Sequence, residues 1–181
     1  CSVLTSAPEL PATSLANNCY DGMFSMCTNL KTAPKLPAEV LANQCYIYMF
    51  SGCTNLKTAP KLPARNSRFE CYFGMFSGCT NLKSAELSIE FLSRSCCSYM
   101  FYDCTNLSSV TMLAPSKVIS GSYLDNWLNN AGTDQSVQNR TLKVQDKAAY
   151  EALKANASYL PTNWQIGKCT VLDKDGNVIT E

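Results

Sequence analysis

The chain has 181 residues, enough for one domain with a buried core and a cap. Its 15 basic and 14 acidic side chains nearly cancel, which excludes the strong cationic field that nucleic acids and anionic membranes select. Histidine is absent, and this removes the commonest general base and the commonest partner of cysteine in metal sites.

Residues 1–12 match a string that recurs later in the chain. Cys1 lies 26 residues before Cys27, and SAPELPA at 6–12 matches TAPKLPA at 32–38. We therefore expect a partial first repeat here, cut from a longer series of repeats. A competing interpretation takes Cys1 as the lipid-carrying first residue of a mature lipoprotein.

The following residues repeat a unit of about 26 residues. CTNLKTAPKLPA at 27–38 recurs unchanged at 53–64, a third copy begins at Cys71, and a more diverged fourth begins at Cys96. Such an identity within one chain indicates a repeat architecture. One unit cannot bury its own apolar edge, whereas stacked units can.

Each unit is predicted to contain a short helix and then a short strand. Leu15, Cys19, Met23 and Cys27 are spaced by four, which places them along one face of a helix. Glycine before the second cysteine suits a helix C-terminus, and Pro34 prevents the helix from continuing. The Lys-Thr-Ala string after the Thr-Asn turn predicts a short extended segment.

We expect the strands of successive units to form one parallel sheet. Neighbouring strands lie about 4.8 Å apart, so equivalent side chains should form closely spaced columns. The residues expected to pair from unit to unit are Ser6, Thr32, Thr58, Ser84 and Ser109.

The unit resembles that of a known family. CYxxMFSGCTNL, from residue 45 or 71 onward, is similar to the I-G-x-x-A-F-x-G-C-x-x-L pattern of the BspA-type leucine-rich repeats of Bacteroides-like bacteria. The resemblance covers about residues 1–113. It implies an α/β solenoid, with short parallel strands on the concave side and short helices on the convex side. It also implies a cell-surface or secreted location, and recognition in place of catalysis.

Two positions depart from the family pattern. Ser67 replaces the leucine found at 15, 41 and 92, and Glu86 replaces the proline found at 34 and 60. The third unit is also one residue short near Glu86, so we expect an irregular exit from its strand.

The 11 cysteines are interpreted as buried free thiols. Those within one unit are eight apart, which does not fit the close pairs of a zinc site. Disulfides are the alternative in an exported protein, above all for Cys97 and Cys169, which fall outside the two repeated columns. The two columns are Cys19, Cys45, Cys71, Cys96 and Cys27, Cys53, Cys79, Cys104.

The strand side supplies the candidate ligand-binding residues, a lysine column beside a hydroxyl column on the concave face. They are Lys31, Thr32, Lys57, Thr58, Lys83 and Ser84. Packing does not require lysine there, because Ser108 fills the equivalent position; plain solvation of the charges is the alternative. Aromatic residues on the other side of the unit either pack in the stack or offer a sugar platform. They are Tyr46, Tyr48, Tyr72, Phe73 and Tyr99.

Residues 114–181 are expected to form a C-terminal α+β cap, because an open stack of units exposes its last apolar rung. Helices are predicted at 121–132 and after Asp146 as N-cap, and a strand at 141–144. The end predicts a strand and a hairpin turning at Asp175-Gly176. Its DKDGN string is similar to part of a calcium loop, but it lacks the distal glutamate, so a turn is expected.

These features predict a non-catalytic recognition or adhesion module. Its expected partner is a host or bacterial surface protein or a glycan, with no cofactor, metal or nucleic acid. Direct membrane insertion is not expected, since no apolar run approaches the roughly 18 residues of a span. A phage receptor-binding or tail-associated protein is the alternative reading, and a hydrolase with its site in the C-terminal segment is a further one.

Overall fold

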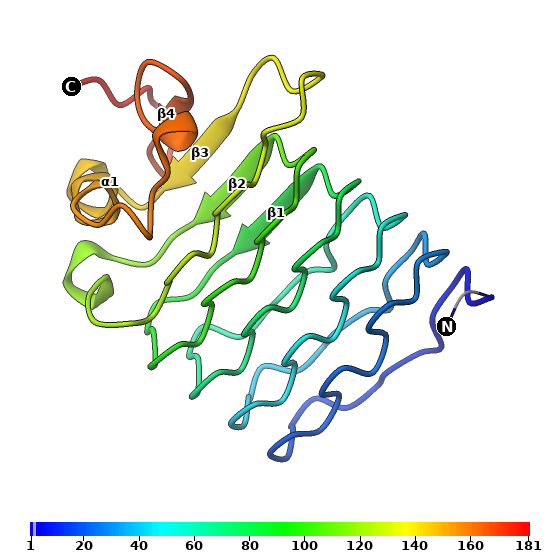
Figure 1. Ribbon diagram of the computed structural model, residues 1–181. Helices are drawn as coiled ribbons and strands as arrows, with labels where there is room; N and C mark the ends of the chain where they lie inside the picture. Colours follow the sequence, from blue (N-terminus) through cyan, green and yellow to red (C-terminus); the bar gives the residue numbers. More distant parts are fainter. Residues whose placement is uncertain (2) are drawn as a thin grey trace.

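The computed structural model describes residue 1 and residues 3–181. Four short strands form one parallel sheet in the order β1-β2-β3-β4. They are β1 (Ser84–Leu87), β2 (Ser109–Met112), β3 (Thr141–Val144) and β4 (Thr170–Leu172). The helices of the described part are α1 (Lys147–Lys154) and the short 3-10 helices η1 (Ser116–Val118) and η2 (Thr162–Trp164). The repeats lie side by side, with α1 and β4 at the C-terminal end of the row (Figure 1).

The segments predicted as helices in the repeats are not helical. Five runs of consecutive turns replace them, and we call these the first to fifth turn segments: residues 17–26, 43–52, 69–78, 94–103 and 121–132. Within a segment every second N–H donates to the carbonyl three residues earlier, as from Met75 to Tyr72 at 3.2 Å. A helix would need every N–H to reach the fourth residue back. The predicted helices of the repeats and of 121–132 are therefore wrong.

The remaining N–H groups leave the segment and bond to the next one. Five such hydrogen bonds join the third segment to the fourth, its C-terminal neighbour, with donor–acceptor distances of 2.8 to 3.2 Å. The donors there are Glu70, Tyr72, Gly74, Phe76 and Gly78. The backbone N–H groups thus alternate between hydrogen bonds within their own segment and hydrogen bonds to the next segment. A single unit could not form all of these bonds alone.

A residue with a left-handed backbone conformation occurs at every fourth position, and this explains the four-residue period of the sequence. In the second segment Gln44, Tyr48 and Gly52 have φ of 59°, 49° and 70°. Between them the pairs 45–46 and 49–50 point inward and are at most 1% exposed. Glycine and asparagine tolerate positive φ best. They hold many of the equivalent positions: Asn18, Gly22, Gly74, Gly78, Asn126 and Asn130.

The repeated CTNL motif ties each unit to the one before it. The thiol of Cys79 donates to the carbonyl of Phe50 at 3.0 Å, and the side chain of Asn81 donates to the carbonyl of Thr54 at 2.7 Å. Leu82 is fully buried beside them. The same bonds recur in neighbouring units, as Cys53 to Phe24, Cys104 to Phe76, Asn55 to Thr28 and Asn106 to Thr80. The motif is therefore constant because all its parts hold the stack in register.

The strand side is paired only in part. Ser6 bridges Thr32, Thr58 bridges Ser84, and Ser84 pairs with Ser109, all in parallel as predicted. Within residues 3–181 no bridge joins Thr32 to Thr58, so the predicted sheet is interrupted between these two units. Their turn segments still hold them in register, as in the 2.9 Å bond from Phe24 N–H to the Met49 carbonyl.

Regular strands begin in the unit that lacks the proline. Glu86 lies inside β1, which pairs with β2 over its whole length. Proline has no N–H to donate to a ladder, so the units with Pro34 and Pro60 form only isolated bridges. The expected irregular exit of the third strand is therefore wrong. Ser67, the other departure, is buried and accepts a 2.7 Å hydrogen bond from the N–H of Ser93.

The C-terminal elements follow the prediction, apart from the helix at 121–132. Strand β3 spans the predicted 141–144, and Asp146 caps α1 by accepting from the N–H of Ala149 at 2.8 Å. Leu172 bridges Val178 in the predicted hairpin. The stacked backbone continues past residue 113 through the fifth turn segment and β3. The predicted boundary between 1–113 and 114–181 thus marks the end of the sequence repeat, and the backbone pattern extends beyond it.

Two substitutions test the left-handed positions in opposite directions. Gly74 and Ser95 have φ of 57° and 54°. A Cβ on Gly74 would overlap the ring of Tyr48, so Gly74→Ala should lower the free energy of unfolding by about 1–3 kcal/mol. Ser95→Gly should leave it unchanged or raise it by up to about 1 kcal/mol, because glycine removes the left-handed penalty. Urea unfolding measures both changes. A clear loss of stability in Ser95→Gly, as glycine causes inside a helix, would contradict the turn structure.

Candidate functional site

A groove of about 1050 Å³ runs along the strand side of the repeats. Equivalent hydroxyls of three successive units line it, those of Thr58, Ser84 and Ser109. Their strands are bridged in parallel, so the hydroxyls follow one another at roughly the 4.8 Å spacing of a sheet. The proline-containing exit of the second unit, residues 59–63, forms another part of the lining.

Charged side chains of both signs surround these hydroxyls. Lys61 and Arg65 are basic, and Glu39 and Glu86 are acidic. Arg65 forms an ion pair with Glu90, but both side chains are largely exposed, so the pair contributes little to stability. Within residues 3–181 the other three charged groups of the lining have no ion-pair partner. The groove is therefore neutral overall and offers polar groups that the fold does not use.

The structure places two of the six predicted binding residues in this groove. Thr58 and Ser84 line it. The other four are exposed and lie outside the lining: Lys31, Thr32, Lys57 and Lys83. The ammonium of Lys83 donates to Asn106 at 3.2 Å. A role of the lysine column in binding stays a prediction, and the charged groups of the groove were missed because they lie outside the repeated columns considered.

The predicted aromatic set divides into core and surface residues. Tyr46 and Tyr72 are each 1% exposed, and their rings stack with centroids 5.8 Å apart. Tyr48 and Tyr99 are 42% and 37% exposed, and both contact the ring of Phe73. Only this second group is open to a ligand.

All 11 cysteines are free, Cys97 and Cys169 included. Burial raises the pKa of Cys45 and of Cys53 to about 11, so these thiols are protonated and poorly nucleophilic at neutral pH. The hydrogen bond between Cys96 and Cys97 lowers the pKa of Cys96 and raises that of Cys97. Both of these side chains are fully buried, so neither can reach a substrate.

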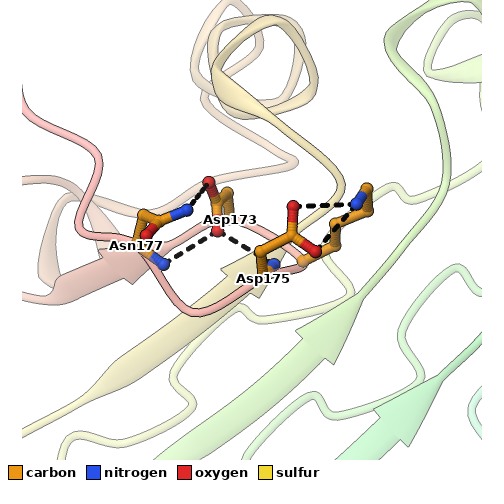
Figure 2. A network of polar contacts seen from close by, with 4 residues as sticks. Asp173, Asp175 and Asn177 are labelled. Carbon is orange, nitrogen blue, oxygen red and sulfur yellow. Dashed lines mark hydrogen bonds and ion pairs between the residues drawn. The ribbon is translucent and has the colours of Figure 1, made fainter.

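The acidic string near the C-terminus is a closed hydrogen-bonded turn (Figure 2). The Asp173 carboxylate accepts from the N–H groups of Asp175 and Asn177 at 2.9 and 2.8 Å, and from the side-chain amide of Asn177 at 2.9 Å. These bonds, chiefly those from Asn177, lower the pKa of Asp173. The carboxylate of Asp175 pairs with Lys174 at 2.8 Å. The predicted turn is confirmed, and its carboxylates face protein donors.

The described residues contain neither a metal-binding cluster nor a membrane-spanning helix. No three histidine, cysteine, aspartate or glutamate side chains are grouped so that they could hold a metal ion. No helix there is long and apolar enough to cross a membrane.

Comparisons with known proteins give no match: no family model, no curated protein and no solved structure is similar to this chain. The groove and the surface residues therefore have to be interpreted from their own chemistry.

Thiol counting tests the two cysteine columns, which are buried as predicted except for Cys19, a half-buried residue of the first unit. In the native protein at about pH 8, exposed Cys1 should react first with a disulfide reagent, while burial protects the column thiols other than half-buried Cys19. In denaturant without a reductant, all 11 thiols should react. A count of about one would instead reveal a disulfide framework.

Proposed function

We propose that the protein is a non-catalytic recognition module, built as a leucine-rich-repeat solenoid of the BspA type. We place it at the cell surface or in the secreted fraction, with a surface protein or a glycan as its partner. The observation that carries this proposal is the groove, whose polar and charged side chains have few partners within the fold. Side chains that do not serve packing are available to a ligand.

The arrangement of the repeats supports the solenoid. Each unit contributes one turn segment whose hydrogen bonds connect it to its sequence neighbours, and parallel bridges add to these bonds along the strand column except between Thr32 and Thr58. Such a stack presents equivalent side chains at a constant spacing along one face, which suits an extended ligand that lies across several units.

The described residues support a role in binding better than a role in catalysis. A thiol nucleophile needs a lowered pKa and access, but the column thiols of Cys45 and Cys53 have raised pKa values and are buried. The groove lining has carboxylates and hydroxyls, without a histidine to activate them.

An array of glycans and extracellular proteins tests the groove with two variants. Ser84→Trp fills the groove from an exposed position, so it should weaken any array binding by about tenfold or more without loss of stability. Gln135→Trp is the control, because Gln135 is exposed and lies outside the groove. Retained binding in Ser84→Trp, or no binding by the parent protein on either array, would contradict the proposal.

A triple substitution tests the lysine column on the same array. Replacing Lys31, Lys57 and Lys83 by serine copies the residue found at Ser108 and should leave stability unchanged, since exposed charges contribute little. If the groove alone binds, the triple variant should keep its affinity. A salt-sensitive loss would extend the site to the lysine column.

A further inference from the structure

Four aromatic side chains form a continuous row on the outer side of the turn segments. They are Tyr48, Phe73, Tyr99 and Tyr102, and we call them the aromatic row. The centroids of successive rings are 5.5, 5.4 and 5.8 Å apart. The interplanar angles of 83°, 47° and 53° show that these rings do not stack flat, unlike the buried tyrosine and phenylalanine columns.

Packing of the repeats does not require these rings. The register of the backbone bonds places Gly22, Gly74 and Asn126 in the same column as Tyr48 and Tyr99. Equivalent positions to Tyr102 hold Ser51 and Ser77. Other units of this same chain therefore form the same backbone with small residues at these positions.

Two of these aromatic residues also have an unfavourable backbone. The φ angles of Tyr48 and Tyr99 are 49° and 57°, a region that glycine and asparagine enter far more readily than tyrosine. Both residues are more than a third exposed, so burial of their rings offsets this strain only in part. A strained residue kept at the surface points to a role outside the fold.

A carboxylate flanks the row on each side. Glu70 comes four residues before Gly74, and Asp103 four residues after Tyr99. Both accept hydrogen bonds from neutral amides, Glu70 from Gln44 at 2.9 Å and Asp103 from Asn130 at 2.7 Å. Within residues 3–181 neither carboxylate pairs with a lysine or arginine. Neither negative charge is therefore neutralised by an ion pair among the described residues.

Glu70 is close enough to act on the row. The pKa of Tyr48 is raised mainly by burial, and then by Tyr99 and by Glu70. No lysine or arginine of the described residues lies over a ring of the row; the cation–π contact that occurs elsewhere joins Lys154 to Tyr150. No cation of the described residues thus contacts the rings or pairs with the two carboxylates, although Arg94 lies in the unit beside Glu70 and its carbonyl accepts from the Glu70 N–H at 3.2 Å.

We propose that the aromatic row, with Glu70 and Asp103, binds a basic segment of a partner protein through an arginine or lysine side chain. The face of an aromatic ring carries partial negative charge and attracts a cation, and a nearby carboxylate adds to this attraction. A neutral sugar could contact the rings but would not neutralise the negative charges of Glu70 and Asp103. The site lies on the turn side of the units, whereas the groove lies on the strand side, so the two can bind independently.

Substitutions copied from the same columns separate binding from stability. Tyr48→Gly and Tyr99→Asn insert the residues found at Gly74 and Asn126, so the melting temperature should stay the same or rise. Glu70→Gln inserts the residue found at Gln44 and removes one carboxylate. Glu151→Gln is the matched control, because it makes the same change at an exposed carboxylate of α1, outside the turn segments that carry the row. A marked fall in melting temperature in the tyrosine variants would show that the rings are structural, and would overturn the proposal.

The binding probe is an acetylated and amidated peptide of alternating arginine and glycine, compared with the same peptide carrying neutral citrulline. Calorimetry at low salt should show saturable binding of the arginine peptide alone, weakening as salt is added. Affinity should fall about tenfold in Tyr48→Gly, Tyr99→Asn and Glu70→Gln and stay unchanged in Glu151→Gln. Absence of binding, equal binding of the citrulline peptide, or equal affinity in all variants would overturn the proposal. Binding of an uncharged oligosaccharide at the row in place of the arginine peptide would overturn it as well.

Discussion

The rest of the structure depends on how the backbone N–H groups of the turn segments are divided. Every second N–H closes a turn within its segment, and the others cross to the next unit, as from Phe76 to Met100 at 2.9 Å. The bonds that cross from the first four turn segments all run toward the C-terminal neighbour, so neighbouring units cannot shift relative to each other without losing the whole set. Equivalent residues are thereby fixed in columns, and the buried cysteines, methionines and stacked phenylalanines follow from that register.

The sequence predicted the register and the pairing of most units, because equivalent residues of a repeated string such as CTNL make the same contacts with the preceding unit. It also predicted β3, the Asp146 cap and the hairpin at 175–176, where local turn and capping chemistry decides the structure. The helices were wrong because a period of four suits both a helix face and a chain of turns. The distinguishing signal was glycine or asparagine at every fourth position, as at Asn18 and Gly22.

The functional surfaces were harder to predict than the fold. The groove depends on charged residues such as Lys61 and Arg65: Lys61 repeats Lys35, but only the fold shows that it lines a groove, and Arg65 stands where the preceding unit has Glu39. The aromatic set was visible in the sequence, but its division into buried Tyr46 and exposed Tyr48 depends on which residues of each four point inward. Each column also shows which residues the same backbone accepts in different units. A side chain that the fold does not require can therefore be recognised, and replaced by the residue of another unit without loss of stability.

The most direct test of this account is the measurement of scalar couplings through backbone hydrogen bonds by NMR spectroscopy. Such a coupling joins the nitrogen of the donor to the carbonyl carbon of the acceptor and so identifies both partners of each bond. We predict couplings from Tyr48 nitrogen to the Phe73 carbonyl and from Phe50 nitrogen to the Met75 carbonyl. A coupling from Phe50 nitrogen to the carbonyl of Tyr46, four residues back as in a helix, would contradict the account.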